Sequence, residues 1–548
     1  MVVPPEQEES QSFRAPVVSG RWVWTANPDT DKVAIVDAKS FSVRLAEAGH
    51  GPTYLTALPT DPNTSKALVI NVGSQDATLL SANATGAVTA SPSIPLQADA
   101  NAWAVSHSGK FAVAWTDTSG FTPDPAQFYQ DISVLDLTGT VPVATRLVVG
   151  PLPSRVFITD DETTAFVVAS SGISVIDLTN ALGPTVLREE QVSDDLKEDA
   201  STRDVSVLPD GSYALVRHEG SAVVTVVRLS DGRREQVTLS GPVTDLDLVP
   251  DAKSALAVVR GDPPTTSAGG TSGAGGSGGF GGVALKDEVT NAGFAGVQAD
   301  GGSGGASPGE AGASNGGASE GGTGGAGDTL RSTLAILPLP GIFSAPTAFE
   351  TVSIDDVFGL VNIAPKGTLA LLYTNAVQSS HLTVLETAPG NSFGSYRTID
   401  VHGIVQDVFP SPDGAYAIAS LTPQAAGDKP GFAVVPVQGS LPTHTQTTEA
   451  PVFAVAQSAS PSARAIVTVS DGTANFAAYI VRMPELVVDR VKLPSKPLAG
   501  ATGLVPDANV AYIAESHPDG RITFIDLQTG VPRTITGFEI SSKVVDGN

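Results

Sequence analysis

Three aspartates occupy the same position relative to a recurring turn, and they are the most regularly placed chemical groups in the sequence. Asp204, Asp245 and Asp407 each stand five residues before a proline that begins a turn. Carboxylate oxygens are ligands that Ca²⁺ prefers. If the three segments are equivalent strands around one axis, this register brings the carboxylates to one rim and predicts a metal site there. The alternative is that each aspartate caps its own turn between repeats and binds no metal.

Three basic or titratable side chains are expected near the same rim. His50 directly precedes Gly51 and Pro52 in a predicted loop, which makes it a candidate for ligand contact. Arg155 and Arg203 are expected beside the aspartates, where they are candidate ligand-binding residues. The alternative is that the two arginines only neutralise the carboxylates.

The rest of the sequence gives no pattern for a catalytic centre. The chain contains no cysteine, which excludes disulfides, thiolate nucleophiles and cysteine-bound metals. Its seven histidines are scattered, without the paired spacing of zinc sites, and no Gly-x-Ser-x-Gly sequence stands in the strand–turn–helix context of a nucleophile elbow. We therefore predict no catalytic residue and no cofactor other than a bound Ca²⁺ at the three aspartates.

These candidate residues lie within a repeat of short apolar strands. A strand that ends in aspartate recurs at Val33–Asp37, Ile132–Asp136, Ile173–Asp177 and Ile522–Asp526. Turns such as Pro209-Asp210-Gly211 separate the first strand of a unit from the second, because proline presets φ, aspartate binds its own backbone and glycine tolerates positive φ.

Ten repeat units follow from the second strands, which are predicted to begin near Trp22, Ala67, Phe111, Thr164, Tyr213, Ala255, Leu369, Tyr416, Ala465 and Val510. A period of about 45 residues without a long helical pattern is typical of four-stranded propeller blades. The sequence therefore predicts an all-β fold, a β-propeller of about ten units in one ring, with two smaller rings as the alternative. The last strand, near residues 534–537, is predicted to pair with residues 13–18 and close the ring.

One segment interrupts the repeat, because 24 of the 60 residues from 268 to 327 are glycine. Such a composition buries too little apolar surface to offset the entropy of ordering. The apolar strand at 254–260 needs a partner at 332–338, so we expect the segment to be an insertion inside one blade. The predicted domains are a flexible segment over 1–12, blades over 13–263, a disordered insertion over 264–328 and blades over 329–548.

Several long connections are predicted between second and third strands, at residues 116–130, 375–380 and 422–431 and at the glycine-rich insertion. In a propeller these connections emerge on the same face. Variable loops on a rigid scaffold are where binding usually resides. We therefore predict that this face is the functional surface.

The repeat resembles the bacterial YVTN-type propeller repeat, a relative of WD40-like and lactonase-like propellers. Trp22–Asn27 (WVWTAN) stands where that family has Tyr-Val-Thr-Asn, and Val148–Pro151 (VVGP) stands where it has Gly and Pro before the inner strand. The resemblance covers nearly everything outside the glycine-rich segment. It implies the fold and says little about activity, because one fold hosts many functions.

The acidic composition limits the partners. The chain has 548 residues with 31 Lys plus Arg against 57 Asp plus Glu, a formal charge of −26, which argues against nucleic acid and anionic membranes. No apolar run reaches the roughly 18 residues of a membrane span.

The lack of cysteine and the low lysine content favour an exported protein, periplasmic, cell-surface or extracellular. A lipoprotein signal would then lie outside this sequence.

The sequence thus predicts a non-catalytic exported β-propeller that presents a loop-rich face to a protein, glycan or cell-envelope component. A lactonase-like hydrolase at the pore mouth and a structural or assembly protein are the alternatives. The oligomeric state is left open.

Overall fold

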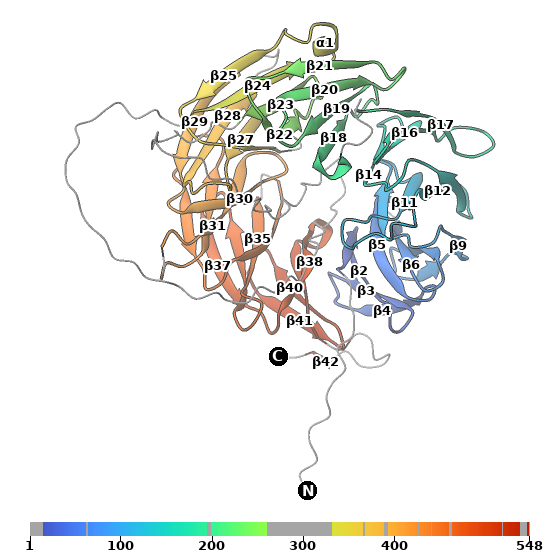
Figure 1. Cartoon of the computed structure of the whole chain (residues 1–548). Coiled ribbons are helices and arrows are strands. Elements are labelled where there is room, and N and C mark those ends of the chain that lie inside the picture. Colours follow the sequence, from blue (N-terminus) through green and yellow to red (C-terminus); the bar gives the residue numbers. More distant parts are fainter. Residues whose placement is uncertain are drawn as a thin grey trace.

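The computed structural model confirms the all-β propeller. It describes residues 15–61, 64–193, 199–259, 331–364, 366, 368–387, 393–425, 427–439, 441–459, 463–517, 519–537 and 545–546. Within these residues the strands form ten antiparallel sheets, each built from consecutive strands in chain order. Figure 1 shows the sheets following one another around a ring, so that the first blade in blue lies beside the last in red.

Blades 1 to 5 come from residues 17–238. Blade 1 consists of β1 (Val17–Ser19), β2 (Trp22–Asn27), β3 (Lys32–Asp37) and β4 (Val43–Glu47). Blade 2 consists of β5 (Pro52–Asp61), β6 (Thr64–Asn71), β7 (Asp76–Asn83) and β8 (Val88–Ala90), with β9 (Ile94–Pro95) also on β7. Blade 3 consists of β10 (Ala102–Val105), β11 (Phe111–Trp115), β12 (Asp131–Asp136) and β13 (Val143–Val148). Blade 4 consists of β14 (Arg155–Ile158), β15 (Thr164–Ala169), β16 (Gly172–Asp177) and β17 (Thr185–Glu190). Blade 5 consists of β18 (Arg203–Val207), β19 (Tyr213–His218), β20 (Val223–Arg228) and β21 (Arg234–Thr238).

Blades 6 to 10 follow in the same order. Blade 6 consists of β22 (Val243–Leu248), β23 (Ser254–Val259), β24 (Ser332–Pro338) and β25 (Glu350–Ile354). Blade 7 consists of β26 (Leu360–Ile363), β27 (Leu369–Tyr373), β28 (His381–Thr387) and β29 (Phe393–Asp400). Blade 8 consists of β30 (Ile404–Pro410), β31 (Tyr416–Thr422), β32 (Gly431–Pro436) and β33 (His444–Thr447). Blade 9 consists of β34 (Val452–Gln457), β35 (Arg464–Ser470), β36 (Phe476–Arg482) and β37 (Val487–Lys492). Blade 10 consists of β38 (Pro497–Val505), β39 (Val510–Glu515), β40 (Arg521–Asp526), β41 (Pro532–Thr536) and β42 (Val545–Asp546).

Short helices occupy three connections of the described chain, η1 (Ala200–Thr202), α1 (Gly341–Ser344) and η2 (Pro506–Ala508). None of the described helices is long and apolar enough to cross a membrane.

The middle strands of each blade are buried on both sides, because alternate side chains of a strand point to opposite faces of its sheet. In β2, Trp22, Trp24 and Ala26 pack against blade 2, whereas Val23 packs against blade 10. This explains why the second strands read as continuous apolar runs. The core is therefore divided among the spaces between neighbouring blades.

The ring closes by side-chain packing and not by a shared strand. A hydrophobic cluster lies between every neighbouring pair of blades, and one of these joins blade 1 to blade 10 through Val23, Val36, Tyr512 and Phe524. The predicted pairing of the last strand with residues 13–18 is wrong. β1 pairs with β2 in its own blade, and β41 pairs with β42. Each blade takes its strands from one continuous segment, so no strand is left to be exchanged.

The predicted repeat is confirmed strand by strand. Every predicted start of a second strand lies within three residues of the observed start, the largest difference being Ala67 against Thr64 in β6. The predicted partners on either side of the glycine-rich segment also pair, from Ser254 with Pro338 to Val259 with Thr333. The predicted flexible segment 1–12 and the predicted insertion 264–328 lie outside the described residues.

Candidate binding site on the loop-rich face

The strand order gives the ring two faces with different connections. Connections from second to third strands, and from a fourth strand to the next blade, emerge on one face, which we call the loop-rich face. Residues 116–130, 374–380 and 423–430 link second to third strands in blades 3, 7 and 8, so the long connections are gathered here as predicted. Val259 and Arg331, which flank the glycine-rich segment, lie at the same face.

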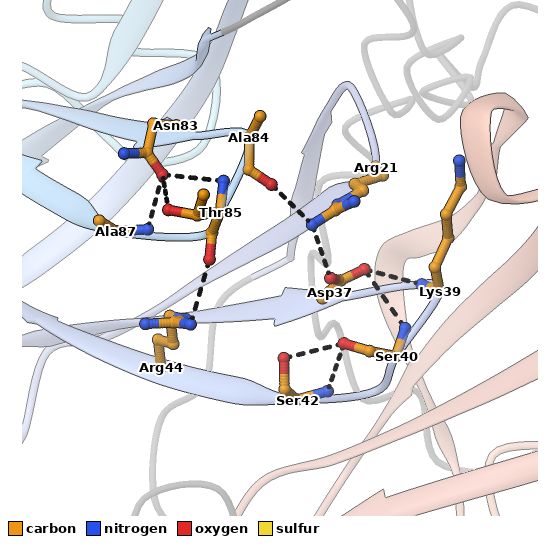
Figure 2. A network of polar contacts seen from close by, with 10 residues as sticks. All are labelled: Arg21, Asp37, Lys39, Ser40, Ser42, Arg44, Asn83, Ala84, Thr85 and Ala87. Atoms are coloured by element: carbon orange, nitrogen blue, oxygen red, sulfur yellow. Dashed lines mark hydrogen bonds and ion pairs between the residues drawn. The ribbon is translucent and has the colours of Figure 1, made fainter.

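The opposite face carries mostly short turns, and we call it the turn face. Figure 2 shows turns of blades 1 and 2 there. Arg21 pairs with Asp37 at 3.1 Å and donates to the carbonyl of Ala84 at 3.1 Å, and Arg44 donates to the carbonyl of Thr85 at 3.3 Å. These contacts join blade 1 to blade 2, which is a structural role.

The aspartate that ends a third strand also has a structural role on the turn face. Asp177 Oδ1 accepts hydrogen bonds from the N–H and the hydroxyl of Thr179, both at 2.8 Å. Asp526 Oδ1 accepts from the N–H groups of Gln528 at 2.9 Å and Thr529 at 2.7 Å. The Thr179 hydroxyl lowers the pKa of Asp177, and the Thr529 N–H lowers the pKa of Asp526. The recurring aspartate is therefore explained by turn capping.

We expect the double variant Asp177→Asn/Asp526→Asn to be less stable than wild type at neutral pH, by an amount that shrinks in acid. The folded pKa of each carboxyl lies below its unfolded value near 3.8. The stabilisation is complete above that unfolded value and is lost as pH falls through the folded pKa. Thermal melts from neutral pH down to about pH 2 measure the difference in Tm. A difference that does not change with pH would contradict the capping role.

The three aspartates predicted as metal ligands lie on the first strands of blades 5, 6 and 8. Asp204 and Asp245 lie in the first half of their strands, and Asp407 lies in the middle of its strand. First strands of neighbouring blades contact one another, and Figure 1 places them toward the ring centre. Asp204 lies 3.5 Å from Arg155 of blade 4 and 3.9 Å from Arg217 of its own blade. Arg203 donates to the carbonyls of Ala169 at 2.8 Å and Ser170 at 3.1 Å, in blade 4. Asp204 and both predicted arginines thus take part in contacts between blades 4 and 5.

Asp245 and Asp407 are brought together around one phenol, apart from Asp204. Asp407 accepts a hydrogen bond from the Tyr373 hydroxyl at 2.9 Å, and Asp245 accepts one from the N–H of Val361 at 2.8 Å. Burial and these neighbouring carboxylates raise the pKa of Tyr373, which keeps the phenol protonated as a donor. No group of three metal-ligating side chains occurs within the described residues. The Ca²⁺ role of the three aspartates stays a prediction.

Tyr373→Phe should lower the free energy of unfolding by about 1–3 kcal/mol, because it removes the hydroxyl that pairs with Asp407 inside the fold. Tyr373 is 1% exposed. Urea denaturation measures the change, and Tyr396→Phe, whose side chain is 47% exposed, is the control that should stay near wild type. Equal stability of Tyr373→Phe and wild type would contradict the contact.

His50 lies in the connection from blade 1 to blade 2 on the loop-rich face, as predicted. Its Nδ1 is 2.9 Å from Asp31 Oδ1, which also accepts the N–H of Gly51 at 2.8 Å. The Gly51 N–H and then His50 lower the pKa of Asp31. The His50 side chain is 72% exposed, so the pair faces solvent. Its ligand-contact role stays a prediction.

A pocket of about 370 Å³ lies between blades 2 and 3 on the loop-rich face. Its lining comes from β5, from the end of β6 and the turn after it, from the connection between the two blades, and from the 116–130 loop. The residues are Tyr54, Ile70, Asn71, Val72, Gln75, Leu96, Gln97, Asp99, Ala100, Asn101, Phe121, Gln127 and Tyr129. The sequence pointed to the 116–130 loop and to none of the other lining residues.

The 116–130 loop is held over this pocket by its own polar contacts. Asn101 donates from Nδ2 to the carbonyl of Asp117 at 2.7 Å and accepts the Asp117 N–H at 2.6 Å. The Tyr129 hydroxyl accepts the N–H of Asp124 at 3.3 Å, and the rings of Phe121 and Tyr129 meet edge to face at 5.9 Å. An ordered loop with exposed aromatic rings therefore forms one wall.

The floor of the pocket is polar and buried. Gln97, which is 3% exposed, donates from Nε2 to the carbonyl of Ala114 at 3.0 Å and accepts the hydroxyl of Ser133 at 2.5 Å. Asn71 adds only backbone to this pocket, because its fully buried side chain lies on the blade 1 side of the sheet, where Nδ2 donates to Asp76 at 2.8 Å and to Thr78 at 3.0 Å. Gln97 lies in a connection that follows no repeat pattern, so sequence periodicity could not identify it.

The sheet order of the chain defines its class as a ten-bladed β-propeller. No family model matches the sequence, and no curated protein matches it. Solved structures that it resembles include dihydro-heme d1 dehydrogenase NirN in complex with DHE, with TM-score 0.41 and 11% identity over 87% of this chain and 77% of that chain. Apo AztD from Citrobacter koseri gives TM-score 0.36 and 11% identity over 74% and 92% of the two chains. Hydrazine synthase of Kuenenia stuttgartiensis gives TM-score 0.31 and 15% identity over 68% and 92%. At this identity the likenesses transfer no function.

Proposed function

We propose that this chain is a non-catalytic binding protein that contacts its ligand through the loop-rich face. The observation that carries the proposal is the pocket of about 370 Å³ between blades 2 and 3, lined by the 116–130 loop. Ligand pockets usually have this order of volume and combine aromatic walls with a few placed polar groups. Phe121 lines the pocket and is 43% exposed, and Phe128 of the same loop is 63% exposed, which adds apolar contact area to the loop-rich face.

The YVTN-type resemblance and the composition support an exported propeller that acts in the cell envelope or outside the cell. A formal charge of −26 disfavours nucleic acid and anionic membrane surfaces as partners. The partner in this proposal is a protein, a glycan or an envelope component.

The proposal is tested by binding to a printed glycan array and to a peptide array, with two matched variants. Phe128→Ser removes an exposed apolar side chain from the loop-rich face, and Leu182→Ser removes one that is 97% exposed on the turn face. We expect at least one array signal that Phe128→Ser weakens and Leu182→Ser leaves unchanged. No signal on either array, or equal loss in both variants, would contradict the proposal.

The lactonase-like alternative is separated from binding by a lactone hydrolysis screen. Asp204→Ala and Asp245→Ala remove two of the three first-strand carboxylates that the sequence predicts at the rim. We expect wild type and both variants to hydrolyse lactones at the uncatalysed rate. If wild type hydrolyses a lactone and either variant abolishes that activity, the binding proposal is replaced by an enzymatic one.

A further inference from the structure

A second pocket, of about 260 Å³, lies between blades 8 and 9 at the end of the 423–430 connection. Blade 8 contributes this connection, its last strand β33 and the residues that lead to blade 9. Blade 9 contributes β36 and its last strand β37. The lining residues are Lys429, Gln446, Thr447, Thr448, Glu449, Tyr479, Val488 and Arg490. Like the 116–130 loop, the 423–430 connection therefore borders a pocket on the loop-rich face.

The lining carries more positive than negative charge, although the chain as a whole is strongly acidic. Lys429 and Arg490 are its cations, and Glu449 is its anion. Glu449 Oε2 accepts a hydrogen bond from Arg490 Nη2 at 2.5 Å, so these two charges offset each other. Lys429 is exposed and has no ion pair within the described residues. The pocket thus keeps one uncompensated positive charge in a chain of charge −26, which favours a ligand with a single negative charge.

Tyr479 supplies a hydrogen-bond donor to the pocket. The residue is 3% exposed, and its ring meets that of Phe432 edge to face at 5.6 Å in the cluster between blades 8 and 9. In the part of the chain that the structure describes, its hydroxyl has no hydrogen-bond partner and is not fully enclosed, so it opens into the pocket that Tyr479 lines. Polar groups of residues this deeply buried are normally hydrogen-bonded. A ligand oxygen would supply the missing acceptor.

The backbone around the pocket is held in place before a ligand binds. The N–H of Thr448 donates to the carbonyl of Pro430 at 2.8 Å, which ties the 423–430 connection to the connection toward blade 9. Gly431 pairs with Thr447, and a Cβ added at Gly431 would collide with the carbonyl of Gln446. The first residue of β32 therefore approaches β33 closely. The cationic end of the connection is thus preorganised beside β33, which lowers the entropy cost of binding.

The position of the pocket suits the end of an extended peptide chain. β33 and β37 are the last strands of their sheets, so each has one edge whose backbone groups are not paired inside its own blade. An extended peptide adds to such an edge through main-chain hydrogen bonds. A volume of about 260 Å³ lies below the usual range of ligand pockets, which limits the inserted part to a terminal residue.

We propose that this pocket binds the C-terminal carboxylate of a peptide chain, as a second site on the loop-rich face. Lys429 pairs with the carboxylate, and the Tyr479 hydroxyl donates a hydrogen bond to it. Arg490 adds the N–H groups that Glu449 does not occupy. Glu449 disfavours a doubly charged phosphate, because it would repel the second negative charge. The inference rests on the binding role proposed for this face, and it makes the partner a protein with a free C-terminus.

Isothermal titration of the full chain with acetyl-tetraalanine, which has a free carboxylate, tests the inference against the same peptide with a C-terminal amide. We expect the acid to bind with one-to-one stoichiometry. The amide should bind about tenfold more weakly, the usual effect of losing a hydrogen bond between charged groups. N-acetylalanine has the carboxylate without the preceding chain and should bind more weakly than the tetrapeptide. Added salt should weaken binding of the acid, because it screens the exposed lysine.

Four variants separate the roles of the lining residues. Lys429→Gln should weaken binding of the acid about tenfold, and Lys39→Gln, at an exposed lysine of the turn face, should bind as wild type does. Glu449→Gln should strengthen binding, because it removes a negative charge and frees Arg490. Tyr479→Phe should weaken binding without lowering Tm, because the hydroxyl has no partner among the described residues.

Several results would overturn the inference. These are no binding of the acid, equal binding of the acid and the amide, unchanged affinity of Lys429→Gln, and weaker binding by Glu449→Gln. Equal affinity of N-acetylalanine and the tetrapeptide would reject the end of a chain as the ligand. Phe128→Ser should leave this titration unchanged, so the array experiment and the titration fail separately. Silence in both experiments rejects both proposals.

Discussion

Phe524→Ala lowers the free energy of unfolding by about 3–5 kcal/mol, the usual cost of truncating a buried phenylalanine. Phe524 is fully buried in the cluster between blade 10 and blade 1, and its ring meets that of Phe41 in blade 1 at 5.4 Å. The Tyr512 hydroxyl donates to the carbonyl of Pro16 at 3.3 Å across the same interface. Packing is what closes the ring here, so this substitution acts directly on closure. Urea denaturation measures the change.

Phe432→Ala is the matched control for closure. Phe432 is also fully buried, and its ring meets that of Tyr479 at 5.6 Å between blades 8 and 9. The two variants should lose similar stability, because the cavities are similar. Blades 8 and 9 are consecutive in the chain, whereas blades 1 and 10 hold its two ends. Hydrogen exchange should therefore speed up in β1 and β41 of Phe524→Ala while both strands stay protected in Phe432→Ala. Equal protection in both variants, or a loss under about 1 kcal/mol for Phe524→Ala, would contradict packed closure.

Gly211→Ala lowers the free energy of unfolding by about 2–5 kcal/mol, as the sum of backbone strain and overpacking. Gly211 has φ of +69° in the turn between β18 and β19, where a side chain is strained. A Cβ added there would lie 2.7 Å from Phe166 Cε2 and 2.8 Å from Thr159 Cγ2, both in blade 4. The carbonyl of Pro209 in the same turn accepts the N–H of Asp160 at 3.0 Å, which holds the turn against blade 4. The turn therefore cannot move away freely to make room.

Gly220→Ala separates the two contributions. Gly220 has φ of +72°, close to that of Gly211, but an added Cβ would meet no atom within 4 Å. Gly220→Ala should therefore lower the free energy of unfolding only by the backbone strain, about 1–2 kcal/mol. Urea denaturation gives the free energy of unfolding of both variants, and the difference between these two free energies is the contribution of the contact with blade 4. If Gly220→Ala were as unstable as Gly211→Ala, the contact between the turn and blade 4 would be refuted.

The blades could be predicted from the sequence because each strand leaves a local mark. Strands buried on both sides read as apolar runs, and Asp177 recurs with its counterparts because each caps the turn that follows it. Gly211 was predicted in a turn from its neighbours Pro209 and Asp210. The contact of Gly211 with Phe166 could not be predicted from the sequence, because that contact lies between two blades and depends on how their sheets pack.

The candidate site was harder to predict because it depends on contacts between blades. The spacing before the turn prolines correctly placed Asp204, Asp245 and Asp407 on first strands. It could not show which side chains these aspartates contact, namely Arg155 for Asp204 and Tyr373 for Asp407. Gln97 lies in the connection between blades 2 and 3, and only the fold brings it into one pocket with the 116–130 loop. Ring closure was predicted through an exchanged strand, since packing between the first and last blades leaves no local signal.

The central claim is that ten blades form one closed ring and gather the long connections on one face. Electron cryomicroscopy of the full chain tests it most directly. We predict a single ring of ten sheets, with density for residues 116–130, 374–380 and 423–430 on the same side. Two smaller rings, an open arc with a space between the first and last sheets, or long loops divided between both sides would contradict the account.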